Sequence, residues 1–149
     1  MRGADRKARP ARLSALWIFV MFNYLYCDVV GLMDSGLLRQ YMTGRVNGVD
    51  LSQGSLLGAS VLMELPIAMI LVSWLAHHRV NRWANVAAGS IMTLVQSATL
   101  FSGTPTAYYL FFSIIEIACA ALIVRYAWMW RPTQTAAVPG VSQQDPAVR

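Results

Sequence analysis

Five polar side chains that could bind a proton or a cation interrupt the long apolar segments of this chain. Three are carboxylic acids and two are amides: Asp28, Glu64, Glu116, Asn23 and Gln96. A charged residue at the centre of a membrane helix costs about 2.5–3.5 kcal/mol, and acids retained there mark proton relays and ion pathways. The residue types therefore indicate a site that handles protons or a cation.

The positions of these residues within their segments predict similar depths in a membrane. At a rise of about 1.5 Å per residue, Glu64 and Glu116 fall roughly 3 Å outward of the midplane, and Asp28 and Gln96 about 5–7 Å outward. Because lipid cannot satisfy polar groups, we predict that these side chains point into a helical bundle. The alternative is structural, since interhelical hydrogen bonds worth under ~2 kcal/mol each would fix the helix register.

The acids have no cation close to them along the chain. The apolar segments contain no lysine, and their one arginine, Arg125, lies nine residues or about 13 Å along its helix from Glu116. We expect Arg125 to extend toward the cytoplasmic interface. Carboxylates held in low dielectric without a cation tend to share protons, so at least one acid is expected to hold a proton at about pH 7.

Other candidates for chemistry carry weaker signals. Cys27 and Cys119 lack CxxC spacing and a nearby histidine, so we interpret both as packing residues. His77 and His78 are adjacent and would point to different faces of a helix. We predict no metal site, no cofactor and no catalytic residue. Without a nucleophile–base pair or a phosphate loop, the sequence leaves enzymatic activity undecided and leans against it.

Composition assigns the chain to the membrane proteins. Of 149 residues, 56% are hydrophobic and 13% are charged, whereas soluble domains have about 45–50% apolar residues. About 20 apolar residues cross a bilayer as a helix. The predicted fold class is therefore all-α, an integral membrane four-helix bundle. Its domain would cover 13–131, with spans over residues 13–33, 55–76, 83–102 and 106–130.

The remaining segments are short. Residues 1–12 are predicted to form a basic cytoplasmic tail, and residues 132–149 a disordered cytoplasmic tail because they lack a periodic apolar pattern. Residues 34–54 form the longest loop, with Asn47-Gly48 as a turn signal. The segment His77–Arg82 is predicted to be a tight connection.

Basic residues near the ends of the spans set the expected orientation, because cytoplasmic loops carry the excess of lysine and arginine. Arg79, Arg82 and Arg131 fall on the same side as the basic N-terminal segment, while Arg39 and Arg45 lie opposite. The prediction is a multi-pass protein of the plasma or inner membrane with both termini inside. Topology also explains the net charge of +5 without a nucleic-acid partner. The tryptophans near the inner ends are interpreted as an interfacial belt: Trp17, Trp74, Trp83, Trp128 and Trp130.

The second and fourth spans share a pattern. LMELPIAMILV aligns without gaps to IIEIACAALIV, which places Glu64 on Glu116 in helices of the same direction. A duplicated helical hairpin would produce that match, and parallel repeats in transporters carry sites between the repeats. Pro66 removes one backbone donor, so a kink is predicted in the second span.

Four segments carry a resemblance to a known family: LWIFVMFNYLYCDVVGLMDSGLL, VLMELPIAM, NRWAN and GTPTAYYLFFSIIEIA. Over residues 13–130 the chain resembles an uncharacterised family of small bacterial four-helix membrane proteins, a domain of unknown function. The arrangement is also similar to that of DoxX-like four-helix proteins. The resemblance implies the architecture and leaves the chemistry open.

Two functions fit the sequence. The first is a small proton- or cation-linked transport or channel-type protein that uses the carboxylate layer. The alternative is an accessory subunit whose polar layer binds a quinone-type ligand or fixes the packing. The lipid bilayer is the expected partner and the protein is expected to form a homo-oligomer, since four helices enclose little space. The transported proton, cation or small solute is not specified by any motif.

Overall fold

The structure, a computed structural model, describes residues 2–101 and 104–130, with side chains from residue 8 onward. Within these residues helices dominate. The elements in chain order are α1 (Arg2–Met33), α2 (Ser35–Met42), β1 (Arg45–Val46), β2 (Val49–Asp50), α3 (Gln53–Leu75), α4 (His78–Phe101) and α5 (Ala107–Trp128). The predicted C-terminal tail, residues 132–149, lies outside the described residues.

Four helices are long and apolar enough to cross a membrane. The qualifying segments are Ala8–Met33, Gln53–Leu75, His78–Phe101 and Ala107–Trp128. Each contains at least 20 residues, about 30 Å of helix, which matches the thickness of a bilayer core. The predicted all-α membrane four-helix architecture is confirmed.

Two helix starts differ from the predicted ones by more than a turn, while the other boundaries agree within two residues. Helix α1 begins at Arg2, so it runs through the segment predicted to be a tail. Helix α4 begins at His78 rather than at residue 83, which makes most of the predicted connection helical. The reason is that His77–Arg82 contains neither proline nor glycine, so nothing in it breaks a helix once Ala76 adopts an extended conformation.

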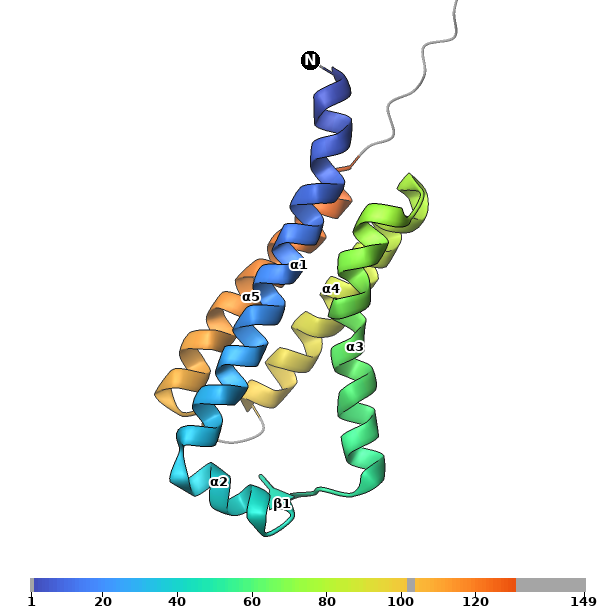
Figure 1. Ribbon diagram of the computed structural model, residues 1–149. Helices are drawn as coiled ribbons and strands as arrows, with labels where there is room; N and C mark the ends of the chain where they lie inside the picture. The colour runs from blue at the N-terminus through green and yellow to red at the C-terminus, as the bar shows by residue number, and fades with distance from the viewer. Residues whose placement is uncertain (1, 102–103, 131–149) are drawn as a thin grey trace, which may run out of the picture.

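The four long helices alternate in direction (Figure 1). Helix α1 packs on α3 and α5, and α4 packs far more extensively on α5 than on α3. One end of the bundle, here called the basic end, carries the start of α1, the α3–α4 turn and the end of α5. The opposite end, here called the hairpin end, carries α2 and the β1–β2 hairpin.

Helix α3 separates from the bundle toward the hairpin end. Its buried residues are Pro66, Met69 and Ser73, all in the half nearer the basic end. Figure 1 shows α3 bent near its middle, with its first half directed away from the other helices. The predicted kink at Pro66 agrees with this bend, because the ring removes a backbone hydrogen bond there. The hairpin-end half of the bundle is consequently less enclosed.

The connection between α1 and α3 is built from local turn signals. Asn47 and Gly48 both have positive φ, 48° and 82°, as a two-residue hairpin turn requires. Arg45 and Asp50 pair across the hairpin at 3.3 Å. The Asp34 side chain caps α2 by accepting from the backbone nitrogen of Gly36 at 2.8 Å. The predicted Asn47-Gly48 turn is therefore present.

The core lies where α1, α4 and α5 meet. Its largest fully buried side chains include Trp17, Met92 and Ile123. Gly89 allows α4 to approach α5 closely, since a Cβ at this position would lie 2.7 Å from Cγ2 of Val124. This contact keeps α4 and α5 together along their length while α3 diverges.

Candidate functional site

Glu116 is a buried carboxylic acid near the middle of a membrane-spanning helix. It lies one to two residues, or about 2 Å, from the midpoint of α5. The side chain is 1% exposed, and neither carboxyl oxygen has a hydrogen-bond partner within the described residues. An unpartnered buried acid requires an explanation, because nearly all buried polar atoms in proteins are satisfied.

Helix α1 supplies most of the groups that interact electrostatically with Glu116. Tyr24 and Cys27 are each 7% exposed, and both interact electrostatically with the Glu116 carboxyl. Cys119, one turn along α5, does the same. These side chains are weak acids, so none of them supplies a positive charge to the carboxyl.

Asp28 connects this buried group to the surface. Its side chain is exposed, and it interacts electrostatically with Glu116 and with Tyr41 of α2. Burial raises the pKa of the Tyr41 hydroxyl, and the neighbouring charge of Asp28 adds to the rise. The prediction that Asp28 points into an enclosed bundle is wrong, because α3 bends away and leaves this part of α1 uncovered. Asp28 instead lies between the Glu116 site and the hairpin end.

The two amides differ in their roles. Gln96 is buried as predicted, and its Nε2 donates to Oγ of Ser113 at 2.8 Å. Ser113 precedes Glu116 by one turn on the same face of α5, so this bond joins α4 to α5 beside the site. Asn23 is only partly buried and donates to the Phe19 carbonyl of its own helix at 2.9 Å. It therefore makes no interhelical contact of this kind.

Glu64 does not share the site. It is the middle residue of α3 and is exposed. Leu62 and Pro66, which face the core, are each two residues away, and two residues correspond to about 200° around a helix. The prediction that Glu64 points inward is therefore wrong. The sequence match between Glu64 and Glu116 extends to depth but not to the direction in which the side chains point.

A separate polar network fixes the helices at the basic end, and the sequence interpretation missed it. The Trp17 indole donates to Oδ1 of Asn85 at 2.7 Å, and Nδ2 of Asn85 donates to Oδ1 of Asn81 at 2.6 Å. Asn81 in turn donates to the Ser73 carbonyl at 2.7 Å. All four residues are at most 1% exposed. Trp17 is thus a buried connection between α1 and α4, and its predicted place in an interfacial belt is wrong.

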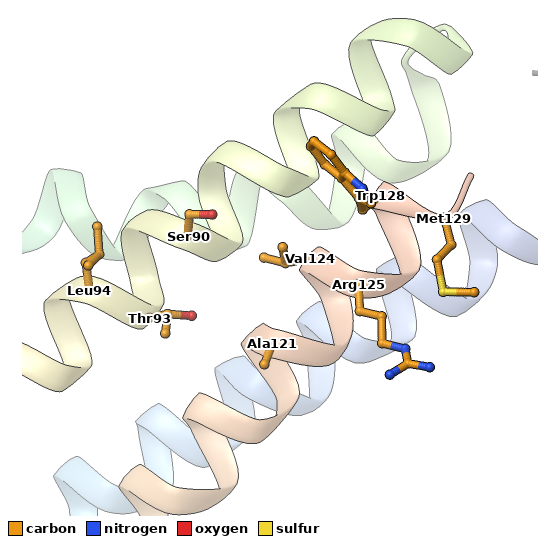
Figure 2. A pocket seen from close by; sticks show the side chains of 8 residues that line it. All are labelled: Ser90, Thr93, Leu94, Ala121, Val124, Arg125, Trp128 and Met129. Atoms are coloured by element: carbon orange, nitrogen blue, oxygen red, sulfur yellow. The ribbon is translucent and has the colours of Figure 1, made fainter. Parts of the chain in front are cut away.

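An open groove on the outside of the bundle lies between α4 and α5 (Figure 2). Its volume is about 520 Å³, and Ser90, Thr93, Leu94, Ala121, Val124, Arg125, Trp128 and Met129 line it. The Thr93 hydroxyl already donates to the Gly89 carbonyl at 2.7 Å. Figure 2 shows the Arg125 guanidinium directed away from the α4 wall. None of the predicted site residues reaches this groove, so it is distinct from the Glu116 site.

The buried carboxyl determines what the Glu116 site can do. A negative charge at the centre of a membrane helix costs about 2.5–3.5 kcal/mol, so the site favours an occupant that neutralises it. Within the described residues no group of three or more His, Cys, Asp or Glu side chains could hold a metal ion. A proton requires only one oxygen, whereas a metal cation requires several.

Comparison with known proteins identifies a family without an assigned activity. The model of DUF6326, described as a family of unknown function, matches residues 4–137. No curated protein and no solved structure matches the chain. The predicted resemblance to a family of unknown function is confirmed. The similarity to DoxX-like proteins stays a prediction.

Proposed function

The chain belongs to the DUF6326 family of unknown function, and from the Glu116 site we propose that it is a small proton-linked transport or channel-type membrane protein. One observation carries this proposal. Glu116 lies at the centre of its span, is 1% exposed and has no hydrogen-bond partner within the described residues. A structural carboxyl would be expected to have one, because hydrogen bonds compensate the desolvation of buried polar groups.

The number of oxygen ligands favours a proton over a cation. Calcium takes six to eight oxygen ligands and magnesium close to six. Asp28 is the carboxylate that interacts electrostatically with Glu116, and its side chain is exposed rather than buried beside Glu116. A proton neutralises Glu116 without further ligands. The site would bind a proton in the closed bundle and release it when water reaches the carboxyl.

The route for protons runs toward the hairpin end. Asp28 interacts electrostatically with both Glu116 and Tyr41, so the three groups form a series from the buried carboxyl to the surface. The diverging first half of α3 leaves this side of the bundle less covered. Toward the basic end, the Trp17–Asn85–Asn81 network and the core around it close the interior. Proton exchange would therefore occur from the hairpin end, and passage to the basic end would require this network to open.

The arginines support placing the basic end in the cytoplasm. Arg12 donates to the Tyr126 hydroxyl at 2.9 Å, and the Arg82 guanidinium lies 5.5 Å from the Trp128 ring. Such arginine–aromatic contacts suit the membrane interface, and basic residues collect on the cytoplasmic side. The protein would then sit in the plasma membrane with both termini inside, and its Glu116 site would exchange protons with the outside.

The proposal is tested by proton flux into vesicles reconstituted with the purified protein. Glu116→Gln keeps the shape and hydrogen-bonding capacity of a protonated glutamic acid but cannot release a proton. We expect the wild type to carry flux that depends on pH, and the Glu116→Gln flux to fall to the level of empty vesicles while thermal unfolding shows the variant to be folded. Glu64→Gln is the matched control, since Glu64 faces away from the site, and it should retain the wild-type flux.

Two outcomes would oppose this function. A Glu116→Gln variant with wild-type flux would show that the buried carboxyl does not handle the transported proton. Wild-type vesicles no leakier than empty ones would favour the second function, an accessory subunit that binds a quinone-type ligand or contributes only packing. The satisfied Trp17–Asn85–Asn81 network fits only the packing form of that second function, because it stabilises the bundle without offering free groups to a ligand.

A further inference from the structure

Glu64 occupies an exposed face that runs the length of α3. The residues of this face, here called the α3 stripe, are Leu57, Ser60, Glu64, Ile67, Leu71 and Trp74. All six are exposed, with Leu57 at 66% and Leu71 at 62%. In a bilayer this face lies against lipid or against another protein. It is the reverse of the face that Pro66, Met69 and Ser73 turn to the core.

The α3 stripe is poorly suited to contact with lipid, because lipid cannot satisfy the carboxyl group of Glu64. The residue is at the centre of the span, and within the described residues no hydrogen bond or ion pair of its carboxyl is found. Snorkelling to an interface is not available to a short side chain about 16 Å from either end of a helix of 23 residues. Ionisable groups in spans almost always face protein or water. The α3 stripe is therefore expected to contact a protein surface that offers a hydrogen-bonding group at the depth of Glu64.

The spacing of the α3 stripe suits a second helix of the same kind. Successive members of the stripe are alternately three and four residues apart. This is the spacing of the contact residues in left-handed helix pairs. Ser60, one turn from Glu64, is small enough to let two backbones approach. Its hydroxyl donates to the Leu56 carbonyl at 2.9 Å and leaves its oxygen able to accept.

We propose that two copies of this chain pair through the α3 stripe, with the Glu64 carboxyls of the two copies hydrogen-bonded to each other. Copies inserted in the same orientation are related by a two-fold axis along the membrane normal, so each residue near the axis meets its own counterpart at the same depth. A protonated carboxyl both donates and accepts. Two Glu64 side chains sharing a proton therefore satisfy each other, and no other partner has to supply the matching group.

Disulfide cross-linking of purified protein in lipid vesicles tests the pairing. Ser60→Cys, made in a background with Cys27 and Cys119 replaced by alanine, should give a covalent dimer on mild oxidation. Leu94→Cys on α4 is the matched control, because Leu94 is 70% exposed and lies at a similar depth, about 6–7 Å from the middle of its helix. It should remain monomeric. No Ser60→Cys dimer, or an equal yield from Leu94→Cys, would overturn the proposal.

The contribution of Glu64 is tested by energy transfer between labelled copies at increasing lipid dilution. Glu64→Gln retains paired hydrogen bonds and should dimerise as the wild type does, whereas Glu64→Leu should dimerise about tenfold more weakly. Leucine is favourable on a lipid-facing surface, so this variant is expected to fold. Dimerisation unchanged in Glu64→Leu would contradict the carboxyl pair. The vesicles contain this chain alone, so a different protein on the stripe would appear as absence of dimer, an outcome independent of proton flux.

Discussion

Replacing Asn85 by alanine is expected to destabilise the protein by about 2–3 kcal/mol, because a buried donor left without a partner costs about 1–3 kcal/mol. Asn85 is fully buried and joins Trp17 of α1 to Asn81 of its own helix. Alanine removes the acceptor of the Trp17 indole and both bonds that Asn85 makes to Asn81. No water in the apolar interior would replace them.

The effect is measured as the free energy of unfolding in detergent, by denaturant titration followed by circular dichroism. Asn23→Ala is the matched control, since the Asn23 amide bonds only to the Phe19 carbonyl within α1 and is partly exposed. Its expected change is within about 0.5 kcal/mol. An Asn85→Ala variant as stable as Asn23→Ala would show that the network does not hold the basic end together.

Gly89→Ala is expected to destabilise the bundle by about 1–3 kcal/mol, as overpacking of a filled interior does. The added Cβ would lie 2.7 Å from Cγ2 of Val124 and 3.4 Å from the carbonyl oxygen of Ala120. The valine side chain is β-branched and stiff, so it cannot turn aside easily. Relief requires α4 and α5 to separate, which weakens the most extensive helix contact in the protein.

The same substitution at Gly58 is expected to have the opposite effect on stability. A Cβ there meets nothing within 4 Å, so Gly58→Ala should leave packing unchanged and stabilise α3 by roughly 0.5–1 kcal/mol through helix propensity. Unfolding of the two variants under the same detergent conditions compares them directly. Destabilisation of similar size in both would show that the loss at Gly89 does not come from the contact with Val124.

The four helices and their order could be predicted because length and hydrophobicity determine them. Apolar segments of about 20 residues have few alternatives to spanning as helices, and short connections force neighbouring helices to alternate in direction. The Asn47-Gly48 turn follows from the preference of these residues for positive φ. Helix ends were less accurate, since a polar segment such as His78–Arg82 continues a helix as readily as it forms a loop.

The directions of the acids could not be predicted from their depth. Apolar residues surround α3 and α5 on all sides, so neither sequence marks which face meets the core. Glu116 faces inward and Glu64 outward because α3 turns Pro66, Met69 and Ser73 to the bundle. Depth alone placed both glutamates in one layer. The direction of Glu64 would follow from the sequence only if Pro66 and Ser73 were recognised as core-facing residues, because both lie on the side of α3 opposite Glu64.

The buried network was missed for a different reason. Asn81 and Asn85 are four residues apart, a spacing that places them on one helix face. The prediction of a connection over His77–Arg82 places Asn81 outside any helix, so the sequence does not reveal the pair. The place of Ser113 beside the site could be predicted from the sequence, because Ser113 lies three residues before Glu116 and hence on the same side of α5.

The central claim is that Glu116 binds and releases a proton within the membrane, and infrared difference spectroscopy of the protein in lipid vesicles tests it most directly. We expect a carboxylic-acid C=O band that changes when the pH is stepped, disappears in Glu116→Gln and persists in Glu64→Gln. Identical difference spectra for the wild type and Glu116→Gln would contradict the account, because the buried carboxyl would then not exchange a proton.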